Sequence, residues 1–132
     1  LDEKVMALLE RLNLADKADL LAKNLPYGDQ RRLEIARALM TDPKILLLDE
    51  PVAGMITTEL EEMAQLVVQI RQDFNVSIIM IEHHMNFVMP IADRIKVVDF
   101  GKTISEGTPD VVQKDPKVIE AYLGGGYQNV NA

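Results

Sequence analysis

The sequence predicts an α/β fold, on three observations. Two runs of consecutive aliphatic residues, 45–48 and 76–81, lack the alternation of a half-exposed strand and are typical of parallel strands buried on both faces. Apolar residues recur every three or four positions over 29–40 and 57–73, which predicts helices. A helix that connects two such strands is the usual arrangement in a parallel sheet, so the order of elements favours an α/β domain.

Composition narrows the class of protein. The chain has 132 residues, 48% hydrophobic and 27% charged, as expected of a globular domain. Its formal net charge of −7 argues against a nucleic-acid partner. The absence of cysteine excludes disulfides and thiolate chemistry. No apolar run reaches the roughly 18 residues of a membrane span, and no secretory signal is visible. Because the chain begins inside an apparent helix, we expect a fragment.

The first segment, 1–42, is expected to be helical. Asn13 tolerates the left-handed conformation and is a suitable stop for a first helix. A loop rich in helix breakers, 24–28, then leads to a second helix that begins at Asp29. The apolar face of the first helix carries Val5, Leu8, Leu9 and Leu12.

The second segment, 43–107, is expected to hold the sheet. Pro43 ends the second helix, because the residue before a proline is pushed out of helical geometry. Thr57 or Thr58 is expected to cap the helix between the two strands. A short helix over 85–92 follows the second strand. A hairpin of strands 95–99 and 101–105 then turns at Phe100-Gly101.

The third segment, 108–132, is expected to hold two short helices. Thr108 and Asp115 each precede a proline, so each is expected to cap a helix. The apolar face of the last helix is expected to carry Ile119, Tyr122 and Leu123, with Gly124–Gly126 as its end.

Two adjacent carboxylates, Asp49 and Glu50, directly follow the first strand. Ligands bind at this edge of the sheet in open α/β folds. Asp49 could hold Mg²⁺, while Glu50 could reach a water that attacks a phosphate. The alternative is that Asp49 caps the following loop and Glu50 is merely solvated.

Two histidines, His83 and His84, follow the second strand. A histidine at this position could hydrogen-bond a terminal phosphate or an attacking water. The alternative is a structural histidine. Adjacent side chains point in different directions on an extended chain, so we expect the two imidazoles to be a poor metal pair.

A glycine-containing loop opens the second helix. Backbone N–H groups and a positive dipole at a helix start can bind an anion, although a plain helix start is the alternative. The loop comprises Leu25, Pro26, Tyr27, Gly28, Asp29 and Gln30.

Together and in this order, the three motifs resemble the C-terminal part of an ABC-transporter ATP-binding subunit, over about residues 1–123. The loop 25–30 matches the family's signature loop, and 45–50 matches the Walker B strand. Gly54 and Met55 match the D-loop, and His83 matches the switch histidine. The Leu-Pro-Tyr-Gly phrase within 25–30 and the ending Ala-Tyr-Leu-Gly-Gly-Gly are similar to the branched-chain amino-acid subgroup.

The resemblance implies a P-loop-type ATPase that powers import of a small solute, with ATP and Mg²⁺ as cofactors. It assigns Mg²⁺ to Asp49 and catalytic roles to Glu50 and His83. Loops 25–30 and 53–56 would act in trans on ATP held by a second ATP-binding subunit. The other implied partners are transmembrane subunits, which would place the protein in the cytoplasm on the inner face of the membrane.

The chain also departs from the family. No Gly-x-x-x-x-Gly-Lys-Ser/Thr loop occurs, so the chain could close a site but not cradle the phosphates itself. Pro26 replaces a usual serine, Asp29 a usual glutamine, and Ile56 a usual polar residue. We therefore expect no turnover from this chain alone. The rival function is a non-catalytic dimerisation module; a two-carboxylate metal phosphatase is weaker, because such sites need more ligands.

Overall fold

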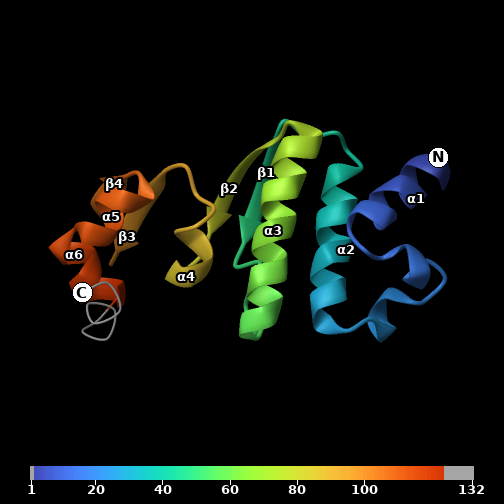
Figure 1. Cartoon of the computed structure of the whole chain (residues 1–132), viewed down its shortest axis with the longest axis horizontal. Coiled ribbons are helices and arrows are strands. Elements are labelled where there is room, and N and C mark those ends of the chain that lie inside the picture. Colours follow the sequence, from blue (N-terminus) through green and yellow to red (C-terminus); the bar gives the residue numbers. More distant parts are fainter. Residues whose placement is uncertain (1, 124–132) are drawn as a thin grey trace. The chain divides into compact units, whose positions relative to one another are not determined.

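The computed structural model describes residues 2–123, and the chain divides into two compact units, Leu1–Ile81 (unit 1) and Glu82–Ala132 (unit 2) (Figure 1). Unit 1 contains α1 (Asp2–Arg11), 3₁₀ turns at Ala15–Lys17 and Ala22–Asn24, α2 (Tyr27–Leu39), β1 (Ile45–Asp49), α3 (Thr57–Phe74) and β2 (Ser77–Ile81). Unit 2 contains α4 (Met85–Val88), β3 (Ile95–Asp99), β4 (Lys102–Gly107), α5 (Pro109–Lys114), α6 (Pro116–Val118) and a π-helical turn at Ile119–Leu123. No helix in this described part is both long and apolar enough for a membrane crossing.

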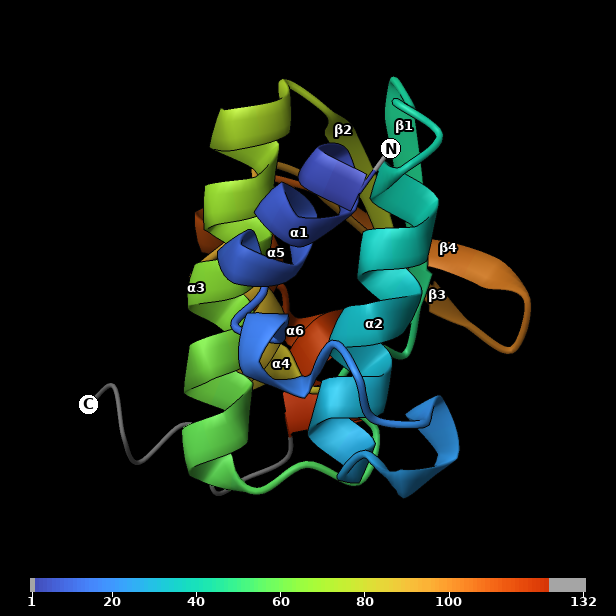
Figure 2. The same ribbon diagram turned by 90° about the vertical axis from the view of Figure 1, so that its right-hand side faces the viewer.

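The two strands of unit 1 are parallel, as predicted, and α3 is the crossover between them. Their register pairs Leu47 with Ile79 and Asp49 with Ile81. In Figures 1 and 2 the helices of unit 1 lie on one side of these strands. Leu46 is accordingly 3% exposed, whereas its neighbour Leu47 is 71% exposed.

Within the described residues these strands are therefore buried on one face and open on the other. Side chains alternate along a strand, so the helices of unit 1 cover one face of the sheet and leave the other in solvent. We call this second face the exposed sheet face. Its large apolar residues are Ile45, Leu47, Ile79 and Ile81.

Single residues with non-helical backbone mark the ends of α1 and α2 and the start of α3. Asn13 adopts the predicted left-handed conformation after α1, with φ of 57°, and Asp42 leaves helical geometry before Pro43, with φ of 51°. The threonine cap predicted for α3 is wrong. Because Ile56 has extended backbone it becomes the N-cap, and its N–H donates to the Glu59 carboxylate at 3.0 Å.

The hairpin of unit 2 turns where the sequence predicts. Phe100 and Gly101 have φ of 47° and 76°, as a two-residue type I′ turn requires. Asp115 caps α6 by accepting a hydrogen bond from the Lys117 N–H, whereas Thr108 makes no side-chain cap and that prediction is wrong. The core of the unit comprises Ile95, Val97, Val112 and Val118.

The short helix after β2 and the side chain of Tyr122 differ from their predictions. The helix expected over 85–92 ends at Val88, two residues before Pro90, which has no N–H to donate. Tyr122 is 41% exposed, so it does not belong to a buried face, and its hydroxyl donates to the carbonyl oxygen of Val98. The predicted helix end at Gly124–Gly126 lies outside the described residues.

Candidate functional site

The acid pair lies where β1 ends. Asp49 is the last residue of the strand, and the Glu50 N–H donates to the carbonyl oxygen of Ile81 at 2.8 Å, which extends the ladder by one residue. Glu50 then turns the chain in a left-handed conformation, with φ of 47°. For a residue with a side chain this conformation costs roughly 1–2 kcal/mol, and such strain is concentrated at functional sites. Both carboxylates are exposed to solvent.

The loop that opens α2 is fixed by its own polar groups. The Gln30 amide Nε2 donates to the carbonyl oxygen of Leu25 at 3.0 Å, and the Leu25 side chain is buried. Pro26 has extended backbone at the N-cap, so α2 begins at Tyr27, two residues earlier than predicted. The loop therefore enters the helix in one defined geometry.

The carboxylate of Asp29 is directed toward the 3₁₀ turn at Ala15–Lys17 and is largely shielded from solvent. Its carboxylate, 14% exposed, forms an ion pair with the ammonium of Lys17. The hydrogen bond to Asp29 is the main cause that raises the pKa of Lys17 above its usual range. The negative charge that distinguishes this loop from the family pattern is thus balanced within unit 1.

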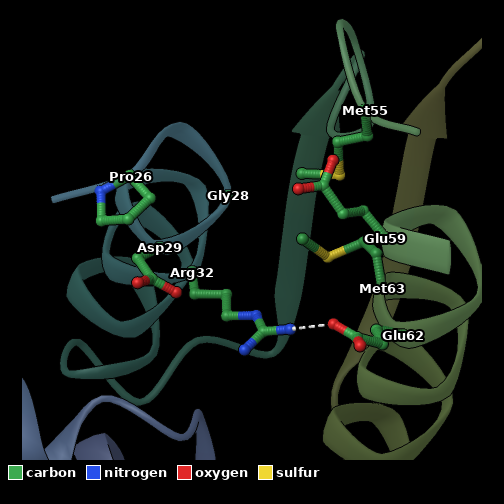
Figure 3. A pocket seen from close by; sticks show the side chains of 8 residues that line it. All are labelled: Pro26, Gly28, Asp29, Arg32, Met55, Glu59, Glu62 and Met63. Atoms are coloured by element: carbon green, nitrogen blue, oxygen red, sulfur yellow. Dashed lines mark hydrogen bonds and ion pairs between the residues drawn. The ribbon is translucent and has the colours of Figure 1, made fainter.

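The loop residues and the D-loop residue meet in one pocket. The pocket has a volume of about 130 Å³ and lies between the start of α2 and the start of α3 (Figure 3). An ion pair of 3.1 Å between Arg32 and Glu62 joins the two helices across it. The lining residues are Pro26, Gly28, Asp29, Arg32, Met55, Glu59, Glu62 and Met63.

Sequence reasoning missed half of this lining. Arg32 lies one helical turn after Gly28, and Met63 lies one turn after Glu59, so each pair shares a helix face. The helical period could have indicated these residues. It could not have indicated that Arg32 and Glu62 meet, because that contact depends on how α2 packs against α3.

Gly28 lines the pocket and Gly54 directly precedes the lining residue Met55, and the two glycines differ in what surrounds them. Gly54 has φ of 76°, and a Cβ there would lie 3.9 Å from the ring of Tyr27. Tyr27 is in turn held by Arg31, whose Nε and Nη2 donate to its hydroxyl at 2.9 and 2.7 Å. At Gly28 a Cβ would meet no neighbouring group within 4 Å, so that position opens outward.

The switch-histidine candidate belongs to unit 2. His83 and His84 follow β2, and their ring centroids are 4.4 Å apart with planes tilted by 32°. The prediction that adjacent imidazoles diverge is wrong, because the chain is no longer a strand after Ile81. One carboxylate oxygen of Glu82 is close to both rings: Oε1 is 2.9 Å from Nδ1 of His84 and 3.7 Å from Nδ1 of His83.

The carboxylate of Glu82 is ionised despite its position. Burial raises its pKa, but hydrogen bonds from the His84 ring and from the backbone N–H groups of His83 and His84 outweigh burial, and the pKa is lowered overall. The other oxygen, Oε2, is buried and has no hydrogen-bond partner among the described residues.

Comparison with known proteins agrees with these motifs. The ABC transporter family model matches residues 1–53, and the model of the branched-chain amino acid ATP-binding cassette transporter matches residues 102–128. The high-affinity branched-chain amino acid transport ATP-binding protein LivG of Escherichia coli K12 is 48% identical over 122 residues, which are 92% of this chain and 48% of LivG. BraF of Pseudomonas aeruginosa, which carries the same description, is 47% identical over 88% of this chain and 46% of its own length.

Solved structures give the same match. An ATP-binding cassette of an ABC transporter in its ADP conformation superposes with a TM-score of 0.83 and 34% identity, over 92% of this chain and 49% of that one. A nucleotide-free cassette superposes with a TM-score of 0.80 and 33% identity. The chain spans about half the length of the curated relatives that it matches.

Proposed function

Because this chain belongs to the family of ABC-transporter ATP-binding proteins, we propose that it takes part in ATP hydrolysis that powers import of a small solute, branched-chain amino acids. The observation that carries this proposal is the pocket of unit 1. It joins the signature-loop candidates Pro26 and Gly28 to the D-loop candidate Met55. Residues from two separate sequence motifs that line one pocket support a shared role in closing on a phosphate group.

The acid pair fits Mg²⁺. Carboxylate oxygens are the ligands that Mg²⁺ prefers, and Asp49 and Glu50 present them to solvent at the end of β1. Bound Mg²⁺ would neutralise developing charge on the phosphates. In this proposal Asp49 would hold the ion and Glu50 would orient the attacking water. His83 would donate a hydrogen bond to the terminal phosphate.

The loop 25–30 would act on nucleotide bound by a second ATP-binding subunit. Its N–H groups at the start of α2 suit an anion, since the helix dipole is positive there. Pro26 lacks the hydroxyl and the N–H that a serine would offer, which weakens this closure. Transmembrane subunits would be the remaining partners, and the protein would work in the cytoplasm at the membrane surface.

A second candidate function is a non-catalytic dimerisation module. The sequence contains no phosphate-binding Gly-x-x-x-x-Gly-Lys-Ser/Thr loop, and the exposed sheet face offers apolar surface for another chain. For this function the acid pair would have no chemical role.

Calorimetry and turnover assays on two proteins separate the candidates. One is this chain, and the other is this chain joined at Leu1 to an N-terminal segment that carries a phosphate-binding loop. We expect no saturable Mg-ATP heat from the chain alone but binding and turnover from the joined protein. Binding to the chain alone tighter than roughly 100 μM would contradict the incomplete-site interpretation.

Substitutions in the joined protein test the roles. Glu50→Gln should retain ATP binding and lose turnover, because the amide keeps the shape and loses the base. Asp49→Asn should weaken Mg²⁺-dependent binding. Glu34→Gln, an exposed carboxylate on α2, is the matched control and should change neither. Near-normal turnover with Glu50→Gln would leave the dimerisation module as the better function.

A further inference from the structure

We propose that Glu82, His83 and His84 form a binding site for a divalent transition-metal ion of the Zn²⁺ class. One ligand atom from each of the three side chains lies within 4.8 Å of the others. The cluster combines two imidazoles with one carboxylate, a donor set that suits Zn²⁺, Cu²⁺ and Ni²⁺ and does not suit Mg²⁺. All three residues belong to unit 2, whereas the acid pair belongs to unit 1.

The spacing is close to what such an ion needs. With Zn–N and Zn–O bonds of about 2.0–2.1 Å, tetrahedral ligand atoms lie about 3.3 Å apart. The distances from Glu82 Oε1 to Nδ1 of His84 and of His83, 2.9 and 3.7 Å, lie on either side of this value. All ligand atoms of the cluster lie within 4.8 Å of one another, so the widest separation must shorten by up to about 1.5 Å when an ion binds, and the His83 side chain is 57% exposed.

The buried carboxylate supplies the second, independent reason. The Glu82 side chain is 1% exposed, and its Oε2 has no hydrogen-bond partner in the part of the chain that the structure describes. A buried ionised carboxylate needs compensation, and its ion-pair partners among the described residues are two histidines, which carry a charge only when they are protonated. A bound dication would provide the missing positive charge.

Binding needs no co-reactant. The ion would accept lone pairs from two imidazole nitrogens and one carboxylate oxygen. Where Nδ1 of His84 carries the proton that it shares with Glu82, this proton moves to Nε2 through solvent, and the ring stays neutral. Three protein ligands leave a fourth position of a tetrahedral ion to water or to an anion. His84 is 36% exposed, so solvent reaches the cluster.

The amino-acid composition leaves few competing ligands for such an ion. The chain has two histidines and no cysteine, so both of its imidazoles lie in this cluster and no thiolate competes. Zn²⁺ is titrated into the 132-residue chain by calorimetry, and the two imidazole resonances are followed by NMR. We expect one Zn²⁺ per chain, and both imidazoles should shift. Mg²⁺ at the same concentration should shift neither.

Variants decide whether the cluster is the site. His84→Asn and Glu82→Gln should each weaken Zn²⁺ binding at least about tenfold, whereas Glu106→Gln, a carboxylate elsewhere in unit 2, should not. If Glu82→Gln fails to fold by circular dichroism, His84→Asn, whose ring is partly exposed, gives the answer alone. The proposal is overturned if no saturable binding occurs up to about 1 mM Zn²⁺, or if His84→Asn binds as tightly as the unsubstituted chain.

Discussion

Asp29 in the first turn of α2 is paired with Lys17, which lies in the 3₁₀ turn after α1. The pair fixes the segment before α2 against the helix that carries the signature-loop candidates. It also means that any anion that approaches the start of α2 meets a neutralised carboxylate rather than a free negative charge.

The first prediction concerns this pair. Lys17→Met and Asp29→Asn should each lower the thermal midpoint, because each leaves a partly buried charge without its partner. The double variant should lose less than the sum of the two, since neither charge is then left unpaired. Circular dichroism measures all four midpoints, with Lys23→Met as an exposed control. Strictly additive losses would show that the pair contributes nothing.

The second prediction concerns the hairpin turn of unit 2. Phe100 has φ of 47° and is 97% exposed, so it bears left-handed strain and makes little packing contact. Phe100→Asn should raise the free energy of unfolding by about 1 kcal/mol, because asparagine tolerates this conformation and Asn-Gly is the preferred type I′ pair. Phe100→Ala is the matched control: it removes the ring but retains the strain. Denaturant unfolding should show no increase in the free energy of unfolding for Phe100→Ala. An equal increase for both variants would mean that loss of the aromatic ring, and not relief of backbone strain, stabilises the chain.

The third prediction is a pH dependence at the cap of α6. The hydrogen bond from the backbone N–H of Lys117, followed by the Ser105 side chain, lowers the pKa of Asp115 below its usual 3.8. The ionised cap therefore stabilises the fold above pH 3.8, and this stabilisation is lost as the pH falls through the lower folded-state pKa. Asp115→Asn keeps an oxygen acceptor but does not titrate.

Thermal midpoints between about pH 2 and pH 7 test this prediction. The advantage of the unsubstituted chain over Asp115→Asn should be largest at neutral pH and should shrink below pH 3.8. Asp110→Asn, in the first turn of α5, controls for general removal of a carboxylate. An advantage that stays constant across the range would mean that Asp115 does not act through its charge.

The fourth prediction is self-association of the chain through the exposed sheet face. Leu47 and Ile79 lie opposite each other on this face, and the described sheet has two strands, so each keeps an open edge. The net charge of −7 opposes association but is screened beyond about 8 Å at physiological salt. Light scattering at micromolar concentration should show dimers or larger species. Leu47→Gln with Ile79→Gln should reduce them, and the control Leu20→Gln with Leu21→Gln should not. A chain that is monomeric without substitution would contradict the prediction.

Sequence patterns predicted those features that neighbouring residues decide. The aliphatic runs around Leu47 and Ile79 identified the two parallel strands, although only one face of these strands is buried. Asn13 and the Phe100-Gly101 turn could be predicted because a left-handed residue is a local requirement.

Features set by packing between distant segments could not be predicted in this way. The ion pairs of Asp29 with Lys17 and of Arg32 with Glu62 depend on which helix faces meet. The His83 and His84 rings lie beyond the end of β2 at Ile81, where the alternation of side chains along a strand no longer determines their directions.

Gly28 lies inside the first turn of α2, where alanine would fit without contact and would strengthen the helix by roughly 0.5–1 kcal/mol. The packing of unit 1 therefore gives no steric reason for a glycine at this position. The missing methyl group leaves a bare stretch of main chain at the rim of the pocket, which a bulky incoming group could approach to van der Waals distance. If the loop acts on nucleotide as proposed above, Gly28→Ala should separate two properties that usually change together: the chain should become more stable to unfolding and should bind the nucleotide less well.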